Sequence, residues 1–112
     1  MKISHVLDTH AFVWSAMGEF DRLGPRARRI IESAAPGKLA IPSAVIMELG
    51  RLIDADKIHL GTRRPSAVFA DALSYNKVLP TSLDAALKAP VLALPHAADP
   101  YDRLIVAEAL VL

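Results

Sequence analysis

The sequence predicts an α/β fold in which a short parallel sheet is covered by helices on both faces. Short β-leaning segments alternate with longer segments of helical composition, and proline or glycine separates most of them. A helix between two such strands normally makes a right-handed crossover, which leaves the strands parallel. The 112 residues are expected to form a single domain, residues 1–112.

In the first half of the chain, strand and helix alternate twice. Residues 3–7 are a short β-leaning run, and residues 10–17 then have the composition of a helix with large apolar side chains. Residues 25–34 start with a proline, which suits the first helical turn, and repeat apolar residues at helical spacing. Residues 38–41 favour a strand, and residues 43–54 favour a helix whose first residue, a serine, is predicted as its N-cap.

The second half continues the alternation until prolines interrupt it. A helix is predicted over residues 64–76, a third short strand over residues 77–79, and a helix over residues 83–88 after a Pro-Thr-Ser start. The next residues are confined to short extended or broken pieces by three prolines, Pro90, Pro95 and Pro100. Residues 101–110 then form a final apolar helix.

The composition narrows the classes of protein and of site. Because the chain has no cysteine, any metal must bind oxygen or imidazole ligands. No apolar run approaches a membrane span and the N-terminus lacks the apolar stretch of a secretion signal, so we expect a cytoplasmic protein. The net charge of +1 gives no global attraction for nucleic acid, so nucleic acid must be bound locally.

Asp8 is the first candidate site residue, because it follows the first predicted strand. Ligands of open parallel sheets gather beyond the carboxyl ends of the strands. An aspartate at this place also caps the following helix by accepting a backbone N–H. When Asp8 is considered alone, the cap is the better explanation.

Glu48 is the second candidate, and it is harder to explain by local structure. It falls between Val45 and Leu49, on or beside the apolar stripe of its predicted helix. A buried carboxylate must be paired, protonated or bound to a metal. Arg51, three residues later, offers a structural partner. The sequence leaves the structural and the functional interpretation open.

Asp99 and Asp102 begin the last predicted helix. Asp99 has the place of the N-cap, the following proline the first helical position and Asp102 the third, so a cap explains Asp99 better than catalysis does. Asp102 shares a helical face with apolar residues, which directs its carboxylate inward toward Glu48.

Asp8, Glu48 and Asp102 are therefore predicted to meet at the carboxyl ends of the strands. Three carboxylates at one place repel one another unless a cation offsets their charge. Magnesium prefers oxygen ligands, and one or two such ions orient a water and stabilise the charge that develops on a phosphodiester. The pattern indicates nuclease chemistry, although spacing alone does not separate this site from acids arranged by chance.

Three segments carry a resemblance to a known family. They are Val6-Leu7-Asp8-Thr9-His10-Ala11, then Ile41-Pro42-Ser43 running into Met47-Glu48, and residues 96–109, which contain Asp99-Pro100-Tyr101-Asp102-Arg103. Through these segments nearly the whole chain resembles the PIN-domain family, and the most similar subgroup is the VapC toxins. The third segment is the most specific of the three.

The resemblance implies a three-layer PIN-like fold and a Mg²⁺- or Mn²⁺-dependent endoribonuclease that hydrolyses RNA with a metal-activated water. By it, Asp8, Glu48 and Asp102 match the family's metal-binding acids. Thr9 matches a hydroxyl that supports the first of them, and Asp99 matches a feature of the subgroup. The implied partners are an RNA substrate, a cognate antitoxin protein and a second copy of the chain in a homodimer.

One feature departs from the family pattern. Family members usually continue past the final helix into another strand with a further acidic residue, whereas this chain stops at Val111-Leu112. The implied fold therefore has its last strand missing. The alternative function is a catalytically inactive PIN scaffold that binds a protein or RNA.

The remaining polar and aromatic residues receive no catalytic role. The histidines share no metal-ligand spacing and are predicted as surface or packing residues; they are His5, His10, His59 and His96. Basic residues cluster at Arg26, Arg28, Arg29, Arg63 and Arg64. They are expected to lie on solvated helix surfaces, and contact with the phosphates of a nucleic acid is the alternative. Core positions are expected for Phe12, Trp14, Met17 and Phe20, and a groove among them would suit an antitoxin helix or strand.

Overall fold

The computed structural model describes residues 2–62, 64–95 and 99–112, and it confirms the α/β fold with a parallel sheet flanked by helices. The sheet has three strands in the order β1-β2-β3. They are β1 (His5–Val6), β2 (Leu39–Pro42) and β3 (Lys77–Leu79). Both ladders are parallel, with Val6 opposite Ala40 and Ile41 opposite Val78.

Helices account for most of the described chain. They are α1 (Thr9–Ala16), η1 (Phe20–Arg22), α2 (Pro25–Ser33), α3 (Ser43–Asp54), α4 (Pro65–Tyr75), α5 (Leu83–Lys88), η2 (Ala89–Val91) and α6 (Pro100–Leu110). Each of the six predicted helices is present, with bounds within about two residues of those expected. None of the described helices is both long and apolar enough to span a lipid bilayer.

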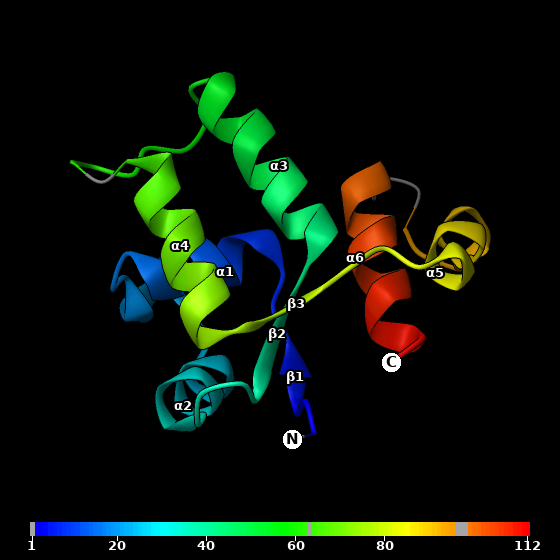
Figure 1. Cartoon of the computed structure of the whole chain (residues 1–112), viewed down its shortest axis with the longest axis horizontal. Coiled ribbons are helices and arrows are strands. Elements are labelled where there is room, and N and C mark those ends of the chain that lie inside the picture. The colour runs from blue at the N-terminus through cyan, green and yellow to red at the C-terminus, as the bar shows by residue number, and fades with distance from the viewer. Residues whose placement is uncertain (1, 63, 96–98) are drawn as a thin grey trace.

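The helices form layers on the two sides of the short sheet. Figure 1 shows α1, α2 and α4 on one side of the strands and α5 and α6 on the other, with α3 rising above the sheet. Helix α3 contacts both α1 and α6, and thereby joins the two sides. This position places α3 beside the first turn of α1 and the first turn of α6.

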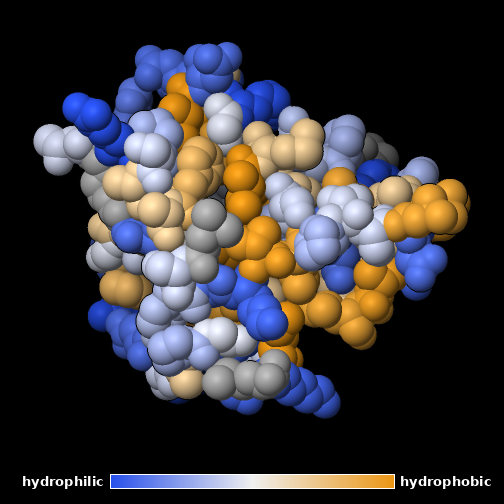
Figure 2. Space-filling model, viewed as in Figure 1, coloured by the Kyte–Doolittle hydropathy of each residue, from blue (hydrophilic) through white to orange (hydrophobic). Residues whose placement is uncertain are grey.

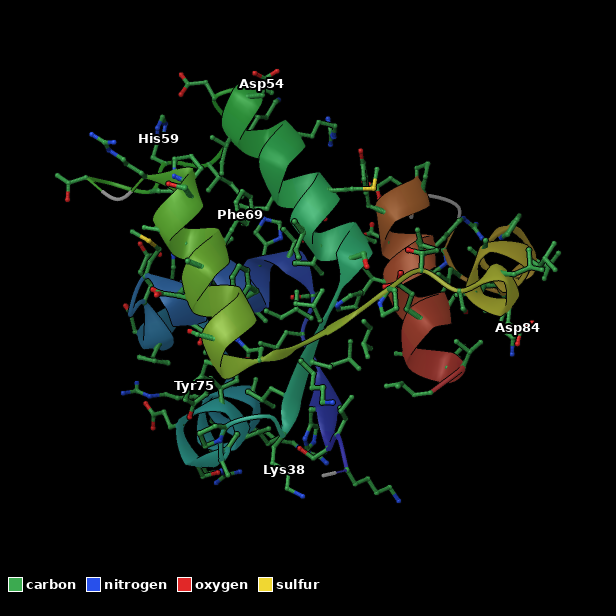
Figure 3. All side chains as sticks on the ribbon, viewed as in Figure 1. Lys38, Asp54, His59, Phe69, Tyr75 and Asp84 are labelled. Carbon is green, nitrogen blue, oxygen red and sulfur yellow. The ribbon has the colours of Figure 1, made fainter. Side chains whose placement is uncertain are left out.

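The central strand and the helix that follows it form the core. All four residues of β2 are buried, and the core continues into α3 through Val45 and Leu49, which are fully buried. Leu7, Phe12 and Val68 complete the same cluster from the neighbouring elements. Figure 3 shows Phe69 of α4 pointing toward the space between α4 and α3, and Phe69 packs against this cluster.

Two local predictions differ from the structure. The strand expected over residues 3–7 is reduced to β1, although Ser4 and Leu7 on either side of it still donate backbone N–H groups to Lys38 and Ala40. After Leu7 the chain leaves the sheet, and Asp8 caps α1. Ser43 is not the N-cap of α3: Pro42 holds that position, and Ser43 is the first helical residue. Its hydroxyl donates instead to the carbonyl oxygen of Leu79 at 2.5 Å, which ties the start of α3 to the end of β3.

Candidate metal centre

The first turn of α6 holds two carboxylates in a fixed arrangement. Asp99 is the N-cap, and Pro100 is the first helical residue. A proline suits that position because the backbone N–H that it lacks would have no partner within the helix. Asp99 Oδ1 accepts from the backbone N–H of Asp102 at 2.9 Å, and Asp102 Oδ2 accepts from the backbone N–H of Asp99 at 3.4 Å. This capping box confirms the predicted cap, and it orients both side chains.

Glu48 approaches the same turn from α3. It lies on the buried face of α3 with Val45 and Leu49, as the sequence predicted, and it is only 8% exposed. The hydroxyl of Thr9, the first residue of α1, donates to Glu48 Oε1 at 2.5 Å. Thr9 is itself 2% exposed, so this hydrogen bond joins α1 to α3 away from water.

Glu48, Asp99 and Asp102 form an acidic group at this point. One carboxylate oxygen from each lies within 4.8 Å of the other two. At that separation, two unit charges repel by about 3 kcal/mol at an effective dielectric constant of about 20, before water screens the more exposed members. The arrangement is therefore unfavourable with all three ionised, unless a cation lies among them.

The donor set fits a hard divalent cation. All the ligand atoms are carboxylate oxygens, which Mg²⁺ and Mn²⁺ prefer. Each carboxylate uses one oxygen for a hydrogen bond within the protein, and no hydrogen bond to its other oxygen is present in the part of the chain that the structure describes. One oxygen from each residue thus remains for an ion or for ordered water.

Arg51 does not neutralise this group, although the sequence offered it as a structural partner for Glu48. Its guanidinium lies over the ring of Tyr101, 5.4 Å from the ring centroid. No salt bridge joins Arg51 to Glu48 among residues 2–62, 64–95 and 99–112. The buried carboxylate is therefore held by a hydroxyl and not by a cationic side chain.

Asp8 lies outside the acidic group. Its side chain is exposed and caps α1, with Oδ1 accepting from the backbone N–H of Ala11 at 2.8 Å. It also borders a mostly apolar groove of about 370 Å³ between β1, α2 and α6. Asp8 nevertheless precedes Thr9 directly in the chain, and the hydroxyl of Thr9 contacts Glu48. Thr9 therefore lies between Asp8 and Glu48.

The structure thus brings together two of the three predicted acids and adds Asp99, which the sequence favoured only as a cap. Thr9 also differs from the role that the family resemblance implied. Its hydroxyl supports Glu48 rather than Asp8, because the first turn of α1 faces α3. The Asp8 side chain instead turns back onto the N-terminus of α1, where it accepts from the backbone N–H of Ala11. His96 and Arg63 lie outside the described residues.

Glu108 is a buried acid that the sequence interpretation did not single out. It lies on α6 at 2% exposure, and its Oε1 accepts from the hydroxyl of Thr81 at 2.5 Å. Its Oε2 has no well-formed hydrogen bond in the described chain. Burial raises the pKa of Glu108, and the Thr81 hydroxyl and the nearby backbone N–H of Ala44 offset part of that rise. The sequence feature that could have pointed to Glu108 is its place as a charged residue within the otherwise apolar C-terminal half of α6.

Comparison with known proteins agrees with this architecture. The chain has an α/β fold and an acidic group, with Glu48 buried and Asp99 and Asp102 more accessible, that could hold a metal ion. Residues 5–112 match the PIN domain, and the chain belongs to the PIN-domain family, whose members are generally metal-dependent nucleases. A search of curated proteins found none that matches the sequence.

The Thr9–Glu48 hydrogen bond can be tested by unfolding. Thr9→Val keeps the shape of the side chain but leaves Glu48 Oε1 buried without its donor, so the free energy of unfolding should fall by about 1–3 kcal/mol. Thr9→Ser keeps the hydroxyl, and its loss should be about 1 kcal/mol or less. Urea unfolding of the metal-free protein measures both. Equal losses for the two variants would show that the hydroxyl contributes nothing.

The raised pKa of Glu108 predicts a pH dependence of stability. The folded protein keeps this proton at pH values where the unfolded chain, with a pKa near the ordinary 4.5, has released it. The resulting stabilisation is complete below pH 4.5 and is lost as the pH rises through the raised pKa of the folded state. Glu108→Gln retains an acceptor for Thr81 and cannot titrate, so its free energy of unfolding should decline less than that of wild type above pH 4.5. Superimposable pH profiles would contradict this account of Glu108.

Proposed function

We propose that this protein is a metal-dependent endoribonuclease of the VapC toxin type, the toxic member of a toxin–antitoxin pair. It hydrolyses RNA phosphodiester bonds with a metal-activated water, using Mg²⁺ or Mn²⁺. The observation that carries the proposal is the acidic group, in which Glu48, Asp99 and Asp102 present oxygens within 4.8 Å of one another. The chain's membership of the PIN-domain family supports the nuclease chemistry.

The residues of the site have distinct tasks in this proposal. Glu48 is the anchor, because its helix is buried and Thr9 fixes one of its two oxygens. Asp102 and Asp99 present oxygens from the more accessible side, where a phosphodiester can approach. When bound, the divalent ion polarises the attacking water and offsets the negative charge that develops on the phosphate.

Asp8 remains a proposed ligand, as the sequence and the family resemblance predicted. In the described conformation its Oδ1 is engaged by the backbone N–H of Ala11. Its other oxygen has no hydrogen bond in the described part of the chain, so that oxygen is open to a ligand while Asp8 continues to cap α1. A contact through an intervening water would suit this position, since Mg²⁺ keeps several of its waters.

The proposal includes a cytoplasmic location and protein partners, namely a cognate antitoxin and a second copy of the chain. The absence of cysteine suits a reducing compartment. Figure 2 shows hydrophobic residues gathered over α5 and the end of α6. The large apolar side chains exposed there are Leu83, Leu87, Val91, Leu110, Val111 and Leu112. An exposed apolar surface of this kind supports contact with another protein chain.

Cleavage of a panel of single-stranded and looped RNAs tests the proposal. Wild-type protein should cleave with Mn²⁺ or Mg²⁺ and stop when a chelator is added. Glu48→Gln and Asp102→Asn each remove a charged ligand with little change of volume, so each should lower the cleavage rate by about 100-fold or more. Asp8→Asn should also lower the rate. Asp84→Asn, an exposed acid on α5 that Figure 3 shows on the far side of α6, is the matched control and should cleave like wild type.

Two outcomes would contradict the proposal of a metal-dependent nuclease. Cleavage that resists the chelator would show that the activity does not use the metal centre. A folded wild-type protein that binds RNA or a partner protein but cleaves no member of the panel would favour the inactive scaffold. Circular dichroism of each variant separates loss of chemistry from loss of folding.

A further inference from the structure

A second groove lies along α1 and shares no lining residue with the acidic group. It has a volume of about 510 Å³ and runs between α1, the 3₁₀-helix η1 and the segment that follows α3. Its polar and aromatic lining comes from His10, Trp14, Glu19, Arg22, Lys57 and His59. Figure 3 shows His59 on the segment between α3 and α4, and Figure 2 shows hydrophilic residues gathered over that segment. The groove is therefore a mixed surface, with aromatic rings and basic side chains together.

Trp14 forms the aromatic wall of this groove. Its ring is half-buried, with the His10 ring tilted by 50° at a centroid distance of 5.6 Å. The guanidinium of Arg22 lies over the indole, 5.7 Å from the centroid, and Glu19 holds Arg22 there through a 3.3 Å salt bridge. Stacking of a nucleobase on an aromatic ring is stronger than the contact of an exposed cation with the same ring. A base can therefore replace Arg22 on the indole, and the freed guanidinium can then contact a phosphate.

The basic residues of the groove suit a phosphate backbone. Lys57 is exposed and has no salt-bridge partner in the described ranges 2–62, 64–95 and 99–112. Arg22 is also exposed, and His59 lies 3.6 Å from Asp56. Glu19 is the one carboxylate in the groove lining, and Arg22 already engages it. A polyanion that enters the groove can thus contact Lys57, which has no salt bridge to an acidic side chain among the described residues.

Helix α1 lines the groove and also contacts the acidic group, because its first residue, Thr9, donates to Glu48. Thr9, which donates to Glu48, is followed directly by His10, and Trp14 comes one helical turn after His10. At a rise of about 1.5 Å per residue, Trp14 lies about 7.5 Å along the helix from Thr9. The groove therefore lies along the same helix whose first residue contacts Glu48.

We propose that this groove binds an unpaired RNA base stacked on Trp14, with Lys57 and Arg22 contacting the flanking phosphates. The RNA is the substrate of the proposed function, on which this inference rests. An antitoxin segment is the less suitable occupant. The larger apolar side chains that a protein partner would cover are exposed on α5 and α6 instead, whereas this groove combines rings with cations.

The fluorescence of Trp14 tests the proposal without any mutation in the groove, because Trp14 is the only tryptophan in the chain. The metal-free protein is titrated, in the presence of a chelator, with a short single-stranded RNA of mixed sequence. Binding is measured in parallel by anisotropy of the labelled RNA. We expect saturable quenching of Trp14 at the same RNA concentrations as the anisotropy change. Inorganic polyphosphate, which has the charge but no base to stack on the indole, should not quench Trp14.

Lys57→Ala should weaken RNA binding several-fold and reduce the salt dependence of the affinity by about one ion. Lys88→Ala, which removes an exposed lysine from α5 across the molecule, is the matched control and should bind like wild type.

Any of four results would overturn the proposal. They are RNA binding without quenching, no RNA binding, equal effects of the two lysine variants, and quenching by polyphosphate. Quenching that persists in Asp102→Asn while cleavage is lost supports both proposals. Quenching by a wild-type protein that never cleaves rejects the nuclease and leaves the RNA groove standing.

Discussion

Burial of the Glu48 carboxylate is the constraint on which the arrangement of the other elements depends. A charged group at this depth needs a partner, and the chain supplies the hydroxyl of Thr9. That contact fixes the start of α1 against α3, directly after β1 ends. Because α3 also packs on α6, the same helix brings Glu48 to the two aspartates at the start of α6. The core around Val45 and Leu49 holds α3 in place and thereby keeps the Glu48 carboxylate at this depth.

The first turn of α6 shows how one set of residues serves folding and chemistry together. Asp99 and Asp102 satisfy the free backbone N–H groups of the helix start, and each still has an oxygen available. The helix dipole favours negative charge at this end, which partly offsets the repulsion among the three acids. A structural explanation of the two aspartates therefore does not compete with a metal-binding one. The cap positions the ligands that a cation would use.

Most of the fold could be predicted from the sequence, because its signals are local. Prolines at residues 25, 65 and 100 each mark the start of a helix, and the alternation of short strands with helices predicted the parallel sheet. The burial of Glu48 could also be predicted from the apolar residues on either side of it. The place of Asp99 in the acidic group was not predicted, because a helix cap and a metal ligand look alike in a sequence.

Other features depend on contacts between distant segments, which a single sequence does not reveal. The hydroxyl of Thr9 reaches a residue 39 positions away, and Ser43 bonds a carbonyl 36 positions away in place of capping its own helix. The environment of Glu108 likewise depends on Thr81, 27 positions earlier. Asp8 was predicted to converge with the other acids, and its cap on α1 directs it elsewhere in the described conformation.

Calorimetric titration of the metal-free protein with Mn²⁺ tests most directly whether Glu48, Asp99 and Asp102 form the metal centre. Wild-type protein should show saturable binding that Glu48→Gln abolishes and that Asp99→Asn and Asp102→Asn each weaken, since every variant removes one charged oxygen ligand. Wild-type affinity in Glu48→Gln would contradict the account. So would loss of binding in Asp8→Asn together with unchanged binding in Asp99→Asn, because the ion would then lie at Asp8 and not in the group that the structure brings together.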